Sequence, residues 1–441
     1  MMGLIGIRRE NKDLTERRSP LTPGQVKALM VSHEIQVKIE PASNRIYKDS
    51  EYSAAGALVT SDLSDCNIIF GVKEIPTSDL TPRQTYCFFS HTIKGQPHNM
   101  PMLKRILDLR DTLLDYERVV DNQGKRLIFF GNFAGYAGLI DTFWALGLRL
   151  NWEGIDNPFS EIKQTKDYEN LNAARQAFTH LGKKIEREGI PSELVPLFCG
   201  FIGYGHVSKG AQEIFDLLPY ETIEAYKVPE FFERHKFSNK KLYKVVFKES
   251  DLVVPRDLKA QFNLQEYYQT PEKYTGIFKN YLPYFTVLVN GIYWEEKYPR
   301  LVTKSFLKNW FQKNPKPRLR VIGDISCDVN GSIECTVKTT NSENPIYVYH
   351  PLTESINDGY SGEGIVILAV DKLPTELPRE ASEYFGQQLL PFLPQLAKTN
   401  FQLPFTELKL PVEFQKALIV HQGQLTPDYK YLIKHIQKIA G

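Results

Sequence analysis

The stretch Gly200-Phe201-Ile202-Gly203-Tyr204-Gly205-His206-Val207-Ser208-Lys209-Gly210-Ala211 decides the fold. It ends a short apolar run, residues 194–202, and leads into residues 209–217, which have helical periodicity. A strand, a glycine-rich turn and a helix in this order are the context in which such a pattern binds a dinucleotide. We therefore predict a dinucleotide-binding Rossmann-type unit around this stretch.

The residues of the turn have separate expected roles. Gly203 is expected to make the tight turn, and Gly205 to let the backbone approach a pyrophosphate at the N-terminus of the helix. Ser208 stands where a third glycine is usual, but it is small, and Gly210 follows two positions later. The predicted cofactor-binding turn also includes Tyr204, His206 and Val207. An ordinary glycine-rich turn is the alternative interpretation.

An acidic residue follows the turn at a familiar distance. Glu224 ends the next predicted strand, residues 222–225, about 20 positions on, where an acid commonly binds the ribose 2′-hydroxyl. Taken alone, Glu224 favours NAD over NADP. A surface glutamate is the alternative.

Strand-like and helical runs alternate along the chain, which predicts the α/β class with parallel sheets. Residues 231–248 are rich in Lys, Arg and aromatic side chains; because acidic residues lie nearby, we expect a solvated loop or strand pair there. The first unit is expected to end near Gly131. Further strands are expected at residues 3–7, 36–39, 68–72, 85–89, 113–116, 286–289, 319–322 and 364–370, and helices at 103–109, 131–150 and 379–390.

The composition narrows the class of partner. The 441 residues carry 54 Lys plus Arg against 52 Asp plus Glu, so no overall field favours nucleic acid or an anionic membrane. No apolar run approaches the ~20 residues that span a bilayer, and the N-terminus does not resemble a signal peptide. The five cysteines form no C-x-x-C pair, which predicts reduced thiols, a cytoplasmic protein and no metal site.

Two candidate acid–base residues follow neighbouring predicted strands. Lys73 and His91 come directly after the strands at 68–72 and 85–89. Ligands of open α/β sheets bind outside the carboxyl ends of the strands, so both residues are expected at one site. A surface lysine and a structural histidine are the alternatives. Carboxylate clamps and charge partners in the same unit are Arg17, Arg18, Glu74 and Glu117.

Several further motifs are spread over nearly the whole chain. They are residues 5–10 (IGIRRE), 16–23 (ERRSPLTP), 71–73 (GVK), 88–94 (FFSHTIK), 207–215 (VSKGAQEIF), 290–295 (NGIYWE), 324–326 (DIS) and 331–334 (GSIE). With these motifs the sequence resembles the lysine-ketoglutarate reductase half of the bifunctional aminoadipic semialdehyde synthases. More distantly, it is similar to saccharopine dehydrogenases and alanine dehydrogenase.

The resemblance implies two Rossmann-like domains with parallel sheets flanking a central cleft. Residues 1–130 and 345–441 would form a discontinuous substrate domain, and residues 131–344 the dinucleotide-binding domain. Lys73 and His91 match the family's catalytic acid–base pair, and Arg18 matches the arginine that holds a substrate carboxylate. The resemblance also implies that Glu74 and Glu117 tune the charged pair, and that Asp324 lies beside the nicotinamide.

The resemblance further implies an activity: condensation of L-lysine with 2-oxoglutarate to saccharopine, with NADP(H) as cofactor. NAD(H) is the alternative cofactor, because Glu224 conflicts with NADPH. The alternative functions are an NAD-dependent, lysine-forming saccharopine dehydrogenase and, from another class, a non-catalytic dinucleotide sensor. Because the sequence lacks the second, saccharopine-oxidising half, a separate enzyme is expected to use the product.

Overall fold

The chain divides into two compact units. The computed structural model describes residues 3–13, 15–234, 236–257 and 259–438. Unit 1 comprises residues 1–130 and 378–441, and unit 2 comprises residues 131–377. The chain therefore returns from unit 2 to unit 1 between residues 377 and 378, and not between residues 344 and 345 as expected. The reason is that strands β14 (Ile346–Tyr349) and β16 (Ile365–Leu368) hydrogen bond into the sheet of unit 2.

Unit 1 contains an eight-stranded sheet in the order β18-β17-β6-β5-β4-β1-β2-β3. Strands β1 to β6 are parallel, whereas β17 is antiparallel to β6. The bounds are β1 (Leu4–Ile7), β2 (Gln36–Ile39), β3 (Leu58–Val59), β4 (Ile68–Phe70), β5 (Thr85–Phe88), β6 (Thr112–Asp115), β17 (Leu418–His421) and β18 (Gln424–Leu425).

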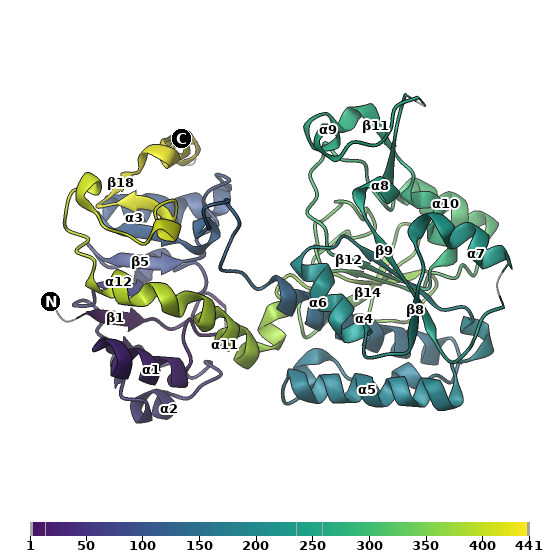
Figure 1. Cartoon of the computed structure of the whole chain (residues 1–441), viewed down its shortest axis with the longest axis horizontal. Helices are drawn as coiled ribbons and strands as arrows, with labels where there is room; N and C mark the ends of the chain where they lie inside the picture. The colour runs from purple at the N-terminus through teal and green to yellow at the C-terminus, as the bar shows by residue number, and fades with distance from the viewer. Residues whose placement is uncertain (1–2, 14, 235, 258, 439–441) are drawn as a thin grey trace. The chain divides into compact units, whose positions relative to one another are not determined.

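The central strands of unit 1 are buried on both faces. All residues of β4, β5 and β6 are buried, as in parallel sheets that helices cover on both sides. Figure 1 shows α11 and α12, from the C-terminal part of the chain, beside the N-terminal strands. The helices of this unit are α1 (Pro23–His33), α2 (Asp49–Ala54), α3 (Met100–Asp108), α11 (Pro378–Leu389), α12 (Leu393–Lys398) and α13 (Ile433–Gln437).

Unit 2 contains a second eight-stranded sheet, in the order β15-β14-β16-β13-β12-β7-β9-β8. Its strands from β16 to β8 are parallel, and β14 and β15 are antiparallel. The remaining bounds are β7 (Phe198–Ile202), β8 (Tyr220–Thr222), β9 (Leu242–Phe247), β12 (Val287–Asn290), β13 (Val321–Asp324) and β15 (Ile356–Asp358). The predicted α/β class with two Rossmann-like domains is confirmed, with antiparallel strands added to each sheet.

Two strands follow the glycine turn on the same side of β7. After β7 and α6 (His206–Phe215), the chain forms β8 at the edge of the sheet and returns through α7 (Val228–Arg234) to β9. Strand β9 pairs directly with β7. Residues 236–241 form the expected loop at the surface. The expected solvation is wrong for β9, which is buried because strands flank it on both sides.

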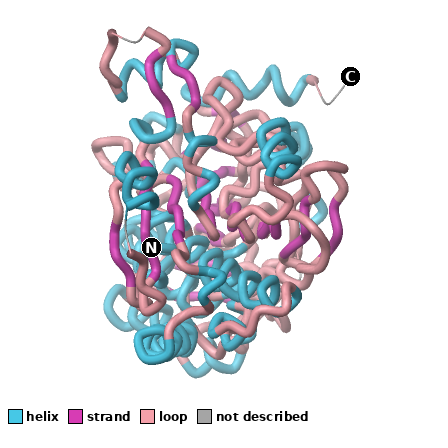
Figure 2. The backbone as a smooth tube through the Cα atoms, turned by 90° about the vertical axis from the view of Figure 1, so that its right-hand side faces the viewer, coloured by secondary structure: helices cyan, strands magenta, loops and turns pink. Residues whose placement is uncertain are grey.

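A short excursion follows β9. It includes α8 (Glu249–Leu252), α9 (Leu264–Gln269) and the antiparallel pair β10 (Val253–Pro255) and β11 (Tyr274–Gly276). Figures 1 and 2 show this pair at the top of the unit, apart from the large sheet. The other helices of unit 2 are α4 (Gly131–Trp152), α5 (Leu171–Glu188) and α10 (Lys304–Lys313).

Helices α4 and α6 pack backbone against backbone. A Cβ atom on Gly135 would lie 2.1 Å from the carbonyl oxygen of Val207, and one on Gly210 would lie 2.3 Å from that of Asn132. Only glycine permits this approach. Close packing of the helix after the glycine turn thus depends on Gly210 as well as on the small, buried Ser208.

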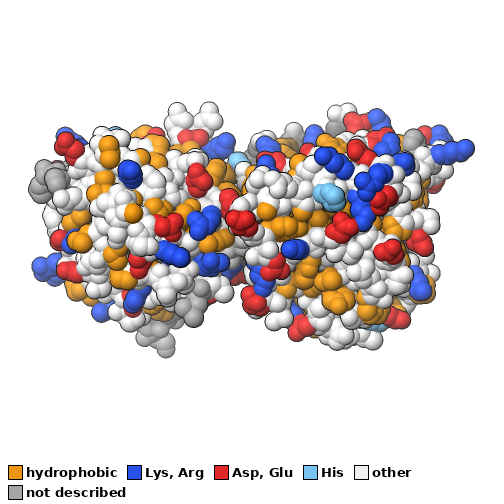
Figure 3. Space-filling model, turned by 90° about the horizontal axis from the view of Figure 1, so that it is seen from below, with side chains coloured by type: hydrophobic (Ala, Val, Ile, Leu, Met, Phe, Trp, Pro, Cys, Tyr) orange, Lys and Arg blue, Asp and Glu red, His pale blue; other side chains and the backbone are white. Residues whose placement is uncertain are grey.

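The surface carries side chains of both signs. On the face shown in Figure 3, acidic and basic side chains are interspersed, in keeping with the formal net charge of +2. Within the part of the chain that the structure describes, no helix has the length and apolar character needed to cross a membrane.

Candidate functional site

Polar side chains gather at the carboxyl edge of the unit 1 sheet. Strands β6, β5, β4 and β1 are consecutive neighbours there and run parallel. Their carboxyl ends therefore meet at one edge. The loops that follow these strands carry Arg8, Glu10, Glu16, Arg18, Lys73, Glu74, His91 and Glu117, and Asp115 is the last residue of β6.

Glu10 ties the loop after β1 to the loop after β4. Its carboxylate accepts hydrogen bonds from the backbone N–H groups of Val72 (2.7 Å) and Lys73 (3.0 Å). Burial raises the pKa of Glu10, although Arg8 opposes the shift. This buried carboxylate fixes the position of the Lys73 backbone, and the sequence analysis did not identify it.

Arg18 forms a bidentate pair with Glu16. Its Nε and Nη2 atoms lie 2.7 and 2.5 Å from the two carboxylate oxygens, and its guanidinium lies 4.1 Å from the Phe130 ring centroid. Burial would raise the pKa of Glu16, but Arg18 and the charge of Lys73 lower it. Among the described residues, Nη1 of Arg18 has no hydrogen-bond partner. Arg17, by contrast, is exposed, and its carbonyl accepts from the N–H of Ile46.

His91 and Glu74 form the second charged pair. Nδ1 of His91 lies 2.7 Å from Oε1 of Glu74, and Nζ of Lys12 lies 3.1 Å from Oε2. Burial would raise the pKa of Glu74, but His91 and Lys12 lower it to about 2. The imidazole stacks on Phe89, and the backbone of His91 is left-handed with φ of 50°. The pair therefore holds the ring by one nitrogen, which leaves Nε2 for proton transfer.

Asp115 joins the loops that carry His91 and Glu117. Its carboxylate accepts hydrogen bonds from the N–H and hydroxyl of Ser90 and from the N–H of Glu117 (2.8 Å). Burial and the charge of Glu117 raise the pKa of Asp115 to about 6. Arg126 lies 3.8 Å from Glu117. Asp115 was not predicted as a site residue. The feature of the sequence that could have indicated it is an acidic residue at the end of an apolar strand.

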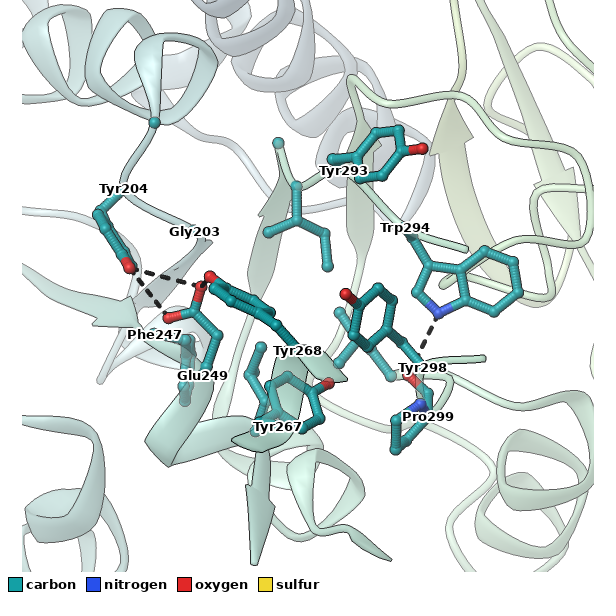
Figure 4. A pocket seen from close by; sticks show the side chains of 15 residues that line it. Gly203, Tyr204, Phe247, Glu249, Tyr267, Tyr268, Tyr293, Trp294, Tyr298 and Pro299 are labelled. Carbon is teal, nitrogen blue, oxygen red and sulfur yellow. Dashed lines mark hydrogen bonds between the residues drawn. The ribbon is translucent and has the colours of Figure 1, made fainter. Parts of the chain in front are cut away.

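Unit 2 has a cavity of about 380 Å³ beside the glycine turn. Gly203, Tyr204 and Gly205 line one part of it. The rest of the lining is mostly aromatic and aliphatic and includes Tyr267, Tyr268, Tyr293, Trp294 and Tyr298, together with Glu249. Figure 4 shows Tyr204, Tyr268 and Trp294 around this space, with Glu249 bonded to the two tyrosines.

The turn fits a dinucleotide. Gly203 has φ of +92°, a conformation that favours glycine, and a Cβ atom there would lie 2.7 Å from Ile292. A Cβ atom on Gly205 would meet nothing within 4 Å, so the backbone is open to a close ligand. Gly205 is the N-cap of α6, whose first N–H groups are suited to a pyrophosphate. His206 is exposed, and Ser208 is buried and accepts from Gln212.

Glu224 does not follow a strand that pairs with β7. Strand β8 is at the edge of the sheet, so β9 separates it from β7. The Glu224 side chain is 60% exposed, pairs with Lys227 at 2.5 Å and accepts from the hydroxyl of Tyr226. Glu249, the first residue of α8, follows the end of β9 by two residues and lines the cavity. The expected position of Glu224 was wrong because the second strand after the turn, not the first, pairs with β7.

Asp324 is a buried centre of hydrogen bonds. It accepts from the Asn290 amide (2.8 Å), the Thr336 hydroxyl (2.6 Å) and the Cys327 N–H (3.3 Å). Burial raises the pKa of Asp324 to about 6. Its carboxylate thus joins the ends of β12 and β13, and its expected place beside a nicotinamide stays a prediction.

Known proteins resemble the chain over most of its length. It is 38% identical to an alpha-aminoadipic semialdehyde synthase of Arabidopsis thaliana, over 98% of this chain and 41% of that protein. The mitochondrial enzyme of the same name from Bos taurus is 36% identical, over 98% of this chain and 48% of its own length. The chain thus spans less than half of these relatives. A saccharopine dehydrogenase [NAD(+), L-lysine-forming] of Emericella nidulans is 29% identical, over 89% of this chain and 92% of that protein.

Solved structures share the fold. An L-alanine dehydrogenase superposes with a TM-score of 0.62 at 18% identity, over 98% of this chain and 99% of its own. A transhydrogenase from Sinorhizobium meliloti superposes with a TM-score of 0.56 at 15% identity, over 96% and 100%. Residues 6–137 match the N-terminal domain of the alanine dehydrogenase/PNT family, and residues 285–428 match its C-terminal domain. The chain belongs to the alanine dehydrogenase/PNT family.

Proposed function

We propose that the chain catalyses the reductive condensation of L-lysine with 2-oxoglutarate to saccharopine, as a lysine-ketoglutarate reductase. The observation that carries the proposal is the joined cluster of Lys73, Glu74 and His91 at the carboxyl edge of the unit 1 sheet. The similarity to aminoadipic semialdehyde synthases over 98% of the chain supports the choice of substrates.

The reaction requires proton transfer at two points. The ε-amine of lysine must lose a proton before its nitrogen attacks the 2-oxo carbon, and the resulting carbinolamine must gain one before water leaves. The C=N bond that remains accepts a hydride, which the reduced dinucleotide supplies when bound. The product is a secondary amine, so carbon, nitrogen and hydrogen balance with release of one water.

The unit 1 cluster offers groups for each proton. His91, held at Nδ1 by Glu74, can take the amine proton at Nε2. Lys73, whose charge lowers the pKa of Glu16, can return a proton to the departing hydroxyl. Glu117 and His91 both act on the charge of Asp115, so these three groups lie close together. These assignments follow the acid–base roles that the resemblance implies.

Arg18 is proposed to hold a substrate carboxylate, but with only part of its guanidinium group. Because Nε and Nη2 bind Glu16, the ligand would be held through Nη1 and the positive charge. Glu16 therefore orients the guanidinium, and Phe130 covers one of its faces. Arg17, which is exposed, can add a second positive charge near the same loop.

A second candidate is the lysine-forming reaction of an NAD-dependent saccharopine dehydrogenase, in which the same residues act in reverse. It is favoured by the Emericella nidulans relative, of which the chain covers 92%. The two candidates differ in direction and in cofactor, NADPH or NADH. A separate enzyme would use or supply saccharopine. We propose a cytoplasmic location from the five free thiols; the bovine relative is named mitochondrial.

An assay panel tests the proposal. NADH and NADPH oxidation would be followed with lysine or ornithine against 2-oxoglutarate or pyruvate, and products identified by mass spectrometry. We expect oxidation to require lysine together with 2-oxoglutarate and to yield saccharopine. Dinucleotide binding without oxidation by any pair of substrates would instead indicate a non-catalytic sensor and overturn the proposal.

A further inference from the structure

Glu249 stands beside the glycine turn at the end of the neighbouring strand. Strand β9 pairs in parallel with β7, and the N–H of Gly203 donates to the carbonyl of Phe247 at 3.0 Å. The turn and the end of β9 therefore lie side by side. Glu249 follows this contact by two residues, begins α8 and lines the cavity (Figure 4).

Two tyrosine hydroxyls fix the Glu249 carboxylate. Tyr268, from α9, donates to Oε1 at 2.7 Å, and Tyr204, from the turn itself, donates to Oε2 at 3.1 Å. A carboxylate has about four acceptor sites, two on each oxygen, so each oxygen of Glu249 can accept another hydrogen bond. Burial and the carboxylate raise the pKa of both tyrosines, which keeps them as donors. The acid is thus held toward the cavity.

The charge of the cavity is negative. Among the described residues that line it, Glu249 has the one charged side chain. Lys297 and Arg300, which lie in the neighbouring segment, pair with Glu295 and Glu334. The lining thus contains no cation that would favour a phosphate next to Glu249.

We infer that Glu249 selects the cofactor and makes this chain bind NADH in preference to NADPH. The inference rests on the proposed dinucleotide site at Gly203 and Gly205. An acid at this place in the sheet can accept a hydrogen bond from the ribose 2′-hydroxyl of NADH. The 2′-phosphate of NADPH would instead place nearly two negative charges against the carboxylate. The chain then differs from the NADPH use that its resemblance to the reductases implies.

Calorimetric titration of the full chain tests this without any turnover. The ligands are NADH and NADPH, with 5′-ADP and adenosine 2′,5′-bisphosphate as probes that lack the nicotinamide. We expect the unsubstituted chain to bind NADH about 100-fold more tightly than NADPH, since a like-charge contact is strongly unfavourable. The two probes should show the same order. This measurement needs no variant.

Substitutions assign the preference to one carboxylate. Glu249→Gln should bring the two affinities within about 10-fold of each other, and Glu249→Arg should reverse their order. Glu224→Gln is the matched control, because Glu224 is the acid at the end of the adjacent strand and lies outside the cavity lining. It should leave the ratio unchanged. Tyr204→Phe and Tyr268→Phe should lower the ratio with little change in melting temperature.

The outcomes separate this inference from the proposed function. Equal or tighter binding of NADPH by the unsubstituted chain overturns the inference, as does a ratio that responds to Glu224→Gln but not to Glu249→Gln. Saccharopine formation with NADPH would leave the proposed function standing in that case. NADH-selective binding without any product would retain the inference and remove the proposed function. Binding of neither dinucleotide would overturn both.

Discussion

Nδ1 of His91 lies 2.7 Å from Oε1 of Glu74, and this contact joins the loops after two neighbouring parallel strands. The contact also lowers the pKa of Glu74, which falls to about 2 although burial would raise it. A carboxylate that stays ionised at neutral pH fixes the tautomer and the orientation of the imidazole.

Glu74→Gln should lower the stability of the chain at neutral pH. The folded pKa of about 2 lies below the ordinary value of 4.5, so the contribution of Glu74 is complete above about pH 4.5 and is lost toward pH 2. We expect the variant to lose on the order of 2 kcal/mol of unfolding free energy at pH 7. Urea denaturation at pH 7 and pH 3 measures this loss, which should shrink at the lower pH. A constant difference would contradict the pairing.

Lys73→Met and His91→Gln should each lower turnover by on the order of 100-fold or more, as removal of a general acid or base commonly does. Dinucleotide affinity should barely change, because the cofactor turn belongs to unit 2. The double variant should lose much less than the product of the two single losses, since the residues act on the same protons. Full activity of either single variant would remove the mechanism.

The positions of Lys73 and His91 could be predicted because their signal is local. Each follows an apolar strand directly, and parallel strands bring such positions to one edge. Glu16 and Arg18 were also close in sequence, and their spacing of two residues allowed the bidentate pair to form. The resemblance predicts a ligand for Arg18, but the pair with Glu16 was not predicted.

The cofactor-selecting acid could not be predicted in the same way. Glu224 and Glu249 each follow the end of a strand by two residues, and no local property of the sequence tells which of the two strands pairs with β7. Strand order depends on how α6, α7 and the excursion after β9 pack, which is a property of the whole unit. The sequence therefore predicts an acidic residue near a strand end, but it does not show which strand pairs with β7.

Arg18→Lys should weaken oxo-acid binding more than dinucleotide binding. A lysine ammonium cannot replace the planar guanidinium that binds Glu16 and lies against Phe130. We expect KM for the oxo acid to rise by about 10-fold or more, with dinucleotide affinity unchanged. Arg149→Lys is a matched control, since Arg149 is a buried arginine of unit 2 paired with Glu153. Its KM should not change. Equal losses for both ligands would argue against the clamp.

Gly205→Asp should abolish dinucleotide binding without unfolding the chain. A side chain there has open space, so the fold tolerates it, but it would carry negative charge to the pyrophosphate position. Gly210→Ala provides the contrast, because its Cβ would lie 2.3 Å from the backbone of α4 and should lower the melting temperature. Titration calorimetry and thermal denaturation measure the two effects. Unchanged nucleotide affinity of Gly205→Asp would refute the site.

A buried pair of carboxyl groups makes the stability of unit 2 depend on pH. Burial and the charge of Asp141 raise the pKa of Glu376, and burial raises the pKa of Asp141 to about 6. Asp141, on α4, accepts two hydrogen bonds of 2.7 Å from Thr165. Because the folded state holds protons that the unfolded state has released, these groups lower stability as the pH rises through about 6.

Glu376→Gln should therefore raise the melting temperature at pH 8 by roughly 2 °C or more, which corresponds to about 1 kcal/mol for a large domain. At pH 5, where the folded pair retains its protons, the gain should largely disappear.

The charges that face the pair include Asp167 and Lys166, so a control must leave the pair intact while changing a nearby charge. Glu343→Gln does this, because Glu343 is exposed and pairs with Lys166 at 2.8 Å. It should give no pH-dependent gain. Thermal denaturation of both variants at the two pH values decides the matter, and a gain at pH 5 equal to that at pH 8 would show that packing, not charge, governs this site.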